Sequence, residues 1–200
     1  RDQLTDSISF FENPSILENG LGRKIRRDWS DGSAGHVALI HAVGTIHGGK
    51  GVPGQSIGSA TLSSAIKEAR EDFSIDAILL RVHSGGGSAL ASDIIAREIK
   101  LCREGENAKP IVVSMGPTAA SGGYYISAYA DAIVAYPTTI TGSIGVVAPV
   151  PNIEKLLGKQ KISWETVKKG DHADFGSIYR SLDSEEETLM KNLIEYSYQQ

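Results

Sequence analysis

The 200-residue chain lacks several features that would indicate a particular chemistry. It has a single cysteine, Cys102, so an internal disulfide and a cysteine-based zinc site are excluded. No apolar run approaches the ~18 residues that span a membrane, and the N-terminus lacks the order of a signal peptide. From these two absences we expect a soluble segment. The net charge is −4 without a long basic run, so we expect no binding to nucleic acid.

Composition favours one α/β domain preceded by an arm. Hydrophobic residues make up 40% of the chain and charged residues 22%, enough for a substantial core. Residues 1–35 are polar, have no sustained period and contain turn signals such as Asn13-Pro14, which predict an arm or linker from a preceding region. Residues 36–200 are predicted to form one domain, and because the chain stops within an apparent helix we expect it to be C-terminally truncated.

Apolar runs and helical periods alternate along the chain. This alternation predicts an α/β fold with a mostly parallel sheet, whose ligand sites lie at the C-terminal ends of strands. Strands are predicted at 36–46, 76–84, 110–116, 131–137 and 162–170, and helices at 59–72 (capped by Ser59 or Thr61), 85–105, 120–130, 152–160 and 183–200.

Two glycine-rich loops each follow a predicted strand and open a predicted helix. They are Ser84–Ser88 and Gly116–Gly123, where free backbone N–H groups and the helix dipole favour a negative oxygen. A phosphate cradle is disfavoured because neither loop has the Gly-Lys-Ser/Thr or GxGxxG pattern. The alternative is an oxyanion hole, with Ser121 as the attacking hydroxyl among small residues that leave its Oγ exposed. A serine beside glycines is also typical of a simple cap or turn.

Two motifs resemble a known family in the expected order. The stretch SMGPTAASGGYYISAYADAIVAYPTTITGSIGVV, at 114–147, closely resembles the central motif of the signal peptide peptidase A family, also called protease IV. The stretch LLRVHSGGGSALASDII, at 79–95, resembles the same family's earlier loop, which usually reads Asn-Ser-Pro-Gly-Gly. The resemblance implies a ClpP/crotonase-like fold of repeated β-β-α units, and a chain similar to the serine-bearing C-terminal repeat of the tandem-repeat members.

The resemblance also implies a serine-lysine dyad and a set of site residues. Ser121 matches the nucleophile, and Ser143 matches the hydroxyl that orients the lysine amine. The amide of Gly122 matches one oxyanion donor, and that of Gly87 or its neighbour Gly86 matches the other. A lysine can act as the base only if its ammonium form is disfavoured, because an ordinary lysine stays protonated at neutral pH.

The chain departs from the family at this lysine. Single-repeat members carry the base in a loop resembling Lys-Ser-Gly-x-x-Lys-Asp, and here Ala173 occupies its place. In one interpretation another repeat or subunit supplies the lysine, as in tandem-repeat members. In a second the base is lost, naturally or by engineering, which leaves an inactive peptide-binding pseudoprotease. In a third Lys168, Lys169 or His172 takes its place, although both lysines are also typical of exposed charges.

Other chemistries remain as alternatives. A Ser-His-Asp triad would pair Ser121 with His83 or His172. An acyl-CoA-handling crotonase relative would use the same fold, but it has no need of the Ser121 motif. No His-x-x-x-His or Cys/His cluster is present, so we expect no metal and no cofactor.

The resemblance implies substrates, partners and a location. Remnant signal peptides would bind as an added strand, with Tyr124, Tyr125 and the loop 48–58 as candidate pocket walls, although core packing also explains the two tyrosines. The family forms oligomers, so we expect a homo-oligomer and a missing N-terminal repeat. The implied location is the extracytoplasmic face of the bacterial inner membrane, or a plastid membrane.

Overall fold

The computed structural model describes residues 24–25, 35–105 and 107–199. The arm predicted for residues 1–35 therefore lies almost entirely outside the described residues. Its described strand, β1 (Lys24–Ile25), pairs antiparallel with the start of the next strand. The chain divides into two compact units, residues 1–144 and 145–200, and each is described by itself.

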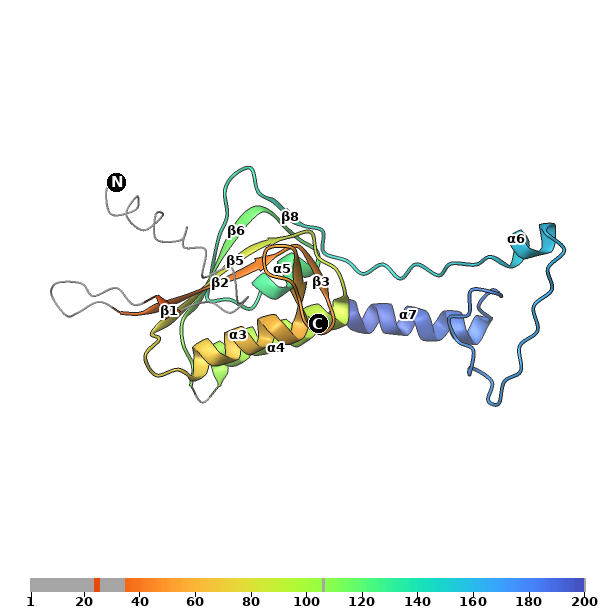
Figure 1. The fold of residues 1–200 in the computed structure, drawn as a ribbon, viewed down its shortest axis with the longest axis horizontal. Helices are drawn as coiled ribbons and strands as arrows, with labels where there is room; N and C mark the ends of the chain where they lie inside the picture. Colours follow the sequence, from red (N-terminus) through yellow and green to blue (C-terminus); the bar gives the residue numbers. More distant parts are fainter. Residues whose placement is uncertain (1–23, 26–34, 106, 200) are drawn as a thin grey trace. The chain divides into compact units, whose positions relative to one another are not determined.

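The first unit is built on a six-stranded sheet that is mostly parallel. At its centre β2 (Val37–Val43), β5 (Ala77–Ser84) and β6 (Ile111–Ala120) are parallel neighbours (Figure 1). β7 (Ala132–Val134) and β8 (Ile140–Gly142) then pair with successive stretches of β6, also in parallel. This topology confirms the α/β class with a mostly parallel sheet.

Two amphipathic helices cover the same side of this sheet. In Figure 1, α3 (Ser59–Glu71) and α4 (Ala89–Glu104) lie side by side below the strands. Side chains on β5 alternate between buried and half-buried along most of the strand, because one face of the sheet meets these helices. Each fully buried isoleucine or leucine contributes about 1.5–3 kcal/mol. The core includes Ile40, Ile66, Leu80, Ile95, Ile99, Ile111 and Val113.

A small second sheet gives the repeated β-β-α unit. β3 (Thr45–His47) pairs in parallel with β4 (Ser56–Gly58), and α3 follows directly. Ile46 of β3 also forms a parallel bridge with Gly87, between β5 and α4. The second strand-helix unit is thereby joined to the first at the glycine loop.

Two local predictions are wrong. The helix α3 has Gly58 at its N-cap and no side-chain cap, because Ser59 is buried within the helix and Thr61 Oγ1 accepts the Gly51 N–H at 3.0 Å instead. Residues 162–170 form no strand, since no neighbouring strand in the described chain pairs with them and their apolar side chains are exposed.

The second unit contains α6 (Glu154–Lys159) and α7 (Ser184–Gln199), as predicted. The residue Asp183 caps α7: its Oδ1 accepts the N–H groups of Glu185 and Glu186, both at 2.9 Å. The carboxylate of Glu186 in turn accepts the Asp183 N–H at 3.1 Å, which completes a reciprocal capping box.

Candidate active site

The serine Ser121 lies at the turn from β6 into α5 (Gly122–Ser127). Its backbone has φ 51° and ψ −122°, a strained conformation for a residue with a side chain. The N–H of Ser121 donates to the carbonyl of Gly142 at 2.8 Å, and its carbonyl accepts the N–H of Tyr125 at 2.8 Å. A strained strand-to-helix turn of this kind projects a nucleophile away from the sheet.

The two glycine loops touch, and only glycine fits where they meet. A Cβ on Gly86 would lie 2.6 Å from the Gly122 nitrogen and 2.8 Å from the Cβ of Ser121. A Cβ on Gly122 would lie 3.2 Å from the Cα of Gly86. The structure therefore brings Gly86, Ser121 and Gly122 together, as the sequence predicts for adjacent strand ends.

Hydrogen bonds distinguish the amides of these loops. The Gly86 N–H donates to the hydroxyl of Ser84 at 3.1 Å and is therefore occupied. In the bridge to β3, Ile46 uses the Gly86 carbonyl (3.0 Å) and the Ser88 N–H (2.9 Å), so the Gly87 N–H points away from β3. Across the described chain, no acceptor is bonded to the N–H of Gly87 or of Gly122, the first residue of α5.

The exposed hydroxyl residue Ser143 follows the carbonyl that holds Ser121. It has φ 52° and comes directly after Gly142 at the end of β8. The strand is fastened to β6 by its own side chain, since Thr141 Oγ1 donates to the Ala119 carbonyl at 2.8 Å. Neither β8 nor the role of Gly142 can be predicted from the sequence, because strand pairing is not visible in a three-residue segment.

The alanine Ala173 and the candidate bases lie in the second unit. Ala173 is exposed in a turn, and its N–H donates to the carbonyl of Gly170 at 3.4 Å. The ammonium of Lys168 lies 2.7 Å from Asp174 Oδ1 and 2.8 Å from the carbonyl of Asp171. Lys168 is therefore engaged as a cation within its own loop.

The guanidinium of Arg180 links this loop to α7. It donates to both carboxylate oxygens of Asp174 (2.7 and 2.8 Å) and to both of Glu186 (2.6 Å each). The hydrogen bond with Arg180, followed by that with Lys168, holds the pKa of Asp174 well below its usual range. The bond with Arg180 also lowers the pKa of the buried Glu186 to about 2.

A histidine and two carboxylates lie close together at the start of α7. Ligand atoms of His172, Asp183 and Glu186 lie within 4.8 Å of one another. The Glu186 oxygens already accept from Arg180, and Asp183 caps α7, so their lone pairs are engaged. The arrangement fits an ion-pair network at a helix start better than a metal centre.

The two candidate triad histidines, His83 and His172, contact residues other than Ser121. His83 is exposed, and its Nδ1 accepts the N–H of Thr118 at 3.3 Å. His172 lies 3.6 Å from Glu185 and 3.7 Å from Glu186. Within the described part of the first unit, no hydrogen bond joins His83 to Ser121, which gives a triad with this histidine no support.

Both tyrosines after Ser121 are half-buried. Tyr124 packs against the core, and the Tyr125 hydroxyl donates to Asp93 Oδ1 at 3.0 Å. Burial, followed by this hydrogen bond, raises the pKa of Tyr125. Its ring meets that of Tyr129 edge to face at 6.2 Å. The contacts of Tyr124 therefore match core packing, whereas Tyr125 is held half-buried beside Asp93.

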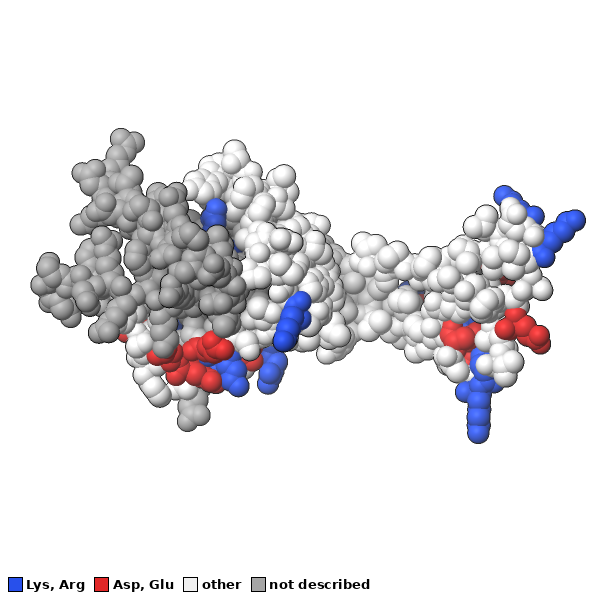
Figure 2. All heavy atoms as spheres, in the orientation of Figure 1, with Lys and Arg blue, Asp and Glu red and all other residues white. Residues whose placement is uncertain are grey.

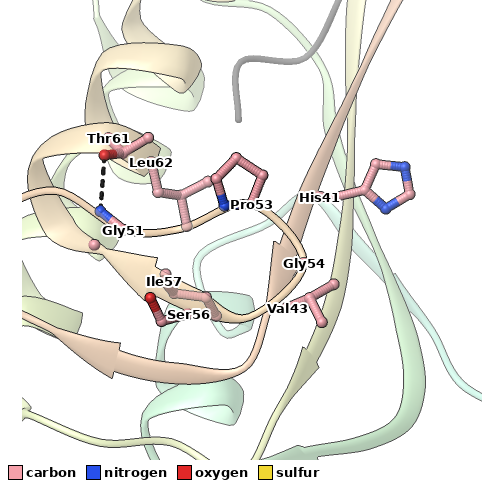
Figure 3. A pocket seen from close by; sticks show the side chains of 10 residues that line it. His41, Val43, Gly51, Pro53, Gly54, Ser56, Ile57, Thr61 and Leu62 are labelled. Carbon is pink, nitrogen blue, oxygen red and sulfur yellow. Dashed lines mark hydrogen bonds between the residues drawn. The ribbon is translucent and has the colours of Figure 1, made fainter. Parts of the chain in front are cut away.

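The loop 48–58 forms a small pocket against β2 and α3 (Figure 3). Figure 3 shows Pro53 and Leu62 close together on one side, with the Gly51 N–H bonded to Thr61 Oγ1. His47 is held to the same loop, with Nε2 3.0 Å from the Ser56 hydroxyl.

Comparisons with known proteins indicate the family of the chain. The model of Peptidase family S49 matches residues 103–200. Protease 4 of Salmonella typhi is 42% identical over 83% of this chain, and the chloroplastic serine protease SPPA of Arabidopsis thaliana is 40% identical over 86%. The chain spans 26% of the length of each of these relatives.

Among solved structures, a ClpP1 mutant from Listeria monocytogenes is similar at 22% identity and a TM-score of 0.37, over 46% of either chain. No helix in the described part of the chain is long and apolar enough to cross a membrane.

The family model and the relatives named above confirm the resemblance seen in the two glycine motifs. The chain belongs to peptidase family S49, the family of Protease 4 and the signal peptide peptidase SppA.

Proposed function

We propose that this chain is the serine-bearing catalytic domain of a peptidase that forms an acyl-enzyme at Ser121. The observation that carries the proposal is the strained turn at Ser121 beside the two unoccupied amides of Gly87 and Gly122. The Ser121 Oγ would attack a peptide carbonyl, and the oxygen that becomes negative would accept these two N–H groups. The occupied amide of Gly86 favours Gly87 over Gly86 as the donor from the first loop.

The base in this proposal is a lysine from another repeat or subunit. Ala173 stands where single-repeat members carry the base, and Lys168 is held as a cation by Asp174. The neutral lysine would take the proton of Ser121 and return it to the leaving amine. The hydroxyl of Ser143, next to the carbonyl that holds Ser121, would orient the amine.

The proposed substrates are extended peptides, in particular remnants of signal peptides at a membrane surface outside the cytoplasm. The name of one relative, a signal peptide peptidase SppA of Enterococcus faecium, supports this substrate class. A homo-oligomer is part of the proposal, and the surface is consistent with it: charged side chains gather beside α3 and α4 in Figure 2, whereas the region over β8 is largely uncharged. Exposed apolar side chains on β7, β8 and the residues that follow these strands include Ile133, Val134, Tyr136, Ile140 and Ile144.

A fluorophosphonate probe, which labels activated serines, tests the proposal. The full-length protein should be labelled, its Ser121→Ala variant should not, and residues 1–200 alone should remain unlabelled because the base is absent. Labelling of residues 1–200 alone would instead mean that the chain has its own base, such as Lys169 or His172.

A second candidate function is that of a pseudoprotease, which binds peptides without cleaving them. It is supported by Ala173, which stands where single-repeat members carry the base. Absence of labelling in the full-length protein, together with saturable binding of an apolar peptide, would support this candidate and overturn the first. A labelled full-length protein that cleaves the same peptide would exclude it.

A further inference from the structure

We propose that Ser84 is a positioning residue that sets the orientation of the oxyanion loop. The inference rests on the proposed function, in which the Gly87 amide receives the negative oxygen. Ser84 is the last residue of β5 and is only 2% exposed. It belongs to the first glycine motif, yet nothing in the chemistry of the dyad requires a hydroxyl there.

The hydroxyl of Ser84 joins two segments of the chain. It donates to the carbonyl of Gly44 at 2.6 Å and accepts the N–H of Gly86 at 3.1 Å. Gly44 is the turn between β2 and β3, with φ 102°, and a Cβ there would lie 2.0 Å from the carbonyl oxygen of Gln55. Because the turn at Gly44 has no room to shift, the two hydrogen bonds of Ser84 hold the loop Ser84–Ser88 in a fixed position relative to this turn.

The hydrogen bond from Gly86 to Ser84 determines which N–H group of the loop has no acceptor within the protein. The Gly86 peptide turns its N–H toward Ser84, and its carbonyl accepts the N–H of Ile46 at 3.0 Å. With both groups of Gly86 occupied, the next amide, that of Gly87, is left pointing away from β3. Gly86 has φ +98°, so the orientation needs both a glycine and an acceptor at Ser84.

Ser84 also touches the segment that carries the nucleophile. A Cβ on Gly123, two residues after Ser121, would lie 2.6 Å from the Ser84 carbonyl oxygen and 3.2 Å from its Cβ. Ser84 therefore lies between the loop that supplies Gly87 and the helix start that follows Ser121. The distance between donor and nucleophile depends on this contact.

Removing the hydroxyl leaves the buried Gly86 N–H without an acceptor. The peptide is then free to rotate toward another acceptor, which moves the Gly87 amide. Loss of one oxyanion donor lowers kcat by about 10²–10³-fold, so a displaced donor should lower it by about tenfold or more. Substrate binding does not involve this hydroxyl, so KM should change little.

The test compares Ser84→Ala with Ser114→Ala in the full-length protein. Ser114 on β6 is a matched control because its hydroxyl accepts an Arg81 N–H at 2.7 Å, but its hydrogen bond does not involve the glycine loops. We expect Ser84→Ala to lower kcat by about tenfold or more, with KM within about twofold, and Ser114→Ala to leave both nearly unchanged. Ser84→Cys, which keeps the shape and bonds more weakly, should give an intermediate kcat if Ser84→Ala folds poorly.

Amide hydrogen exchange at Gly86 is the second readout, and it does not depend on catalysis. Exchange at Gly86 should become faster in Ser84→Ala and stay slow in Ser114→Ala. An unchanged kcat, a rise in KM alone, equal effects of the two alanine variants, or unchanged exchange would overturn the role of Ser84. If the parent protein is never labelled at Ser121, the proposed function fails instead, and the exchange result alone decides the Ser84 contact.

Discussion

The N–H of Ser121 is held by the carbonyl of Gly142, the last residue of β8, at 2.8 Å. β8 pairs with the end of β6, where Thr118, Ala119 and Ala120 lie opposite Ile140, Thr141 and Gly142. The nucleophile therefore obtains its unusual backbone from a neighbouring strand as well as from its own turn. The strain at Ser121 is sustained by this hydrogen bond and by the contact with Gly86.

Two substitutions of Ser121 distinguish its contribution to backbone strain from its role as the nucleophile. Ser121→Gly should be more stable than Ser121→Ala by about 1 kcal/mol, because glycine adopts φ 51° without a Cβ penalty. Neither variant should react with the fluorophosphonate probe. Urea denaturation of both variants measures the difference, and equal stabilities would show that the turn is not strained.

Two glycines of the same loop should respond differently to alanine. A Cβ on Gly87 would lie 2.1 Å from the Ile46 carbonyl oxygen, so Gly87→Ala must break the bridge to β3 and should cost about 1–3 kcal/mol. Gly85 has nothing within 4 Å of a built Cβ, so Gly85→Ala should change stability by less than about 0.5 kcal/mol. Thermal unfolding of the pair checks this contrast, which a similar loss in both variants would contradict.

Much of the first unit could be predicted because its signals are local. Apolar runs marked β2 and β5, and helical periods marked α3 and α4. The meeting of the two glycine loops followed from the rule that parallel strands end at one edge of a sheet. Small residues on both sides of Ser121 likewise indicated a strand-to-helix turn at this position, although Ser121 is half-buried and not exposed.

Features that depend on distant pairing could not be predicted. β6 continues through Pro117 to Ala120, although proline usually ends a central strand, because the register between β5 and β6 shifts near Ser84. The strand predicted at 162–170 has a suitable composition, but Trp164 stacks on Tyr179 at 3.9 Å instead of joining a sheet. The composition of a segment indicates how much apolar surface it can bury. A β-strand also requires an adjacent strand with which to form hydrogen bonds, and composition does not show one.

Acid should weaken the second unit through Glu186. Its pKa is lowered to about 2, chiefly by Arg180, so its contribution to stability is present above the ordinary pKa of about 4.3 and is lost as pH falls toward 2. Trp164 fluorescence, measured with Trp29→Phe as the background, reports unfolding of this unit. In Glu186→Gln the slope of unfolding free energy against pH in this window should be smaller, and an unchanged slope would contradict the assignment.

The thiol of Cys102 should report the opening of α4. Burial, the largest influence on it, raises the pKa of Cys102 to about 12, and the side chain is 0% exposed. Alkylation by iodoacetamide at pH 8 should therefore be slow in the folded protein and fast in urea. Since this is the chain's only cysteine, a single modification measures the reaction. Equal rates in the two conditions would mean that α4 opens readily.

Substitution of Lys168 tests whether this chain supplies the general base for Ser121. The side-chain nitrogen of Lys168 lies 2.7 Å from Asp174 Oδ1 and is therefore held within its own loop. Lys168→Met should therefore leave fluorophosphonate labelling of the full-length protein unchanged. If Lys168→Met abolished labelling while Trp164 fluorescence stayed native, the lysine would have to leave Asp174 and serve Ser121 directly. The base would then come from this chain, and the requirement for another repeat would fail.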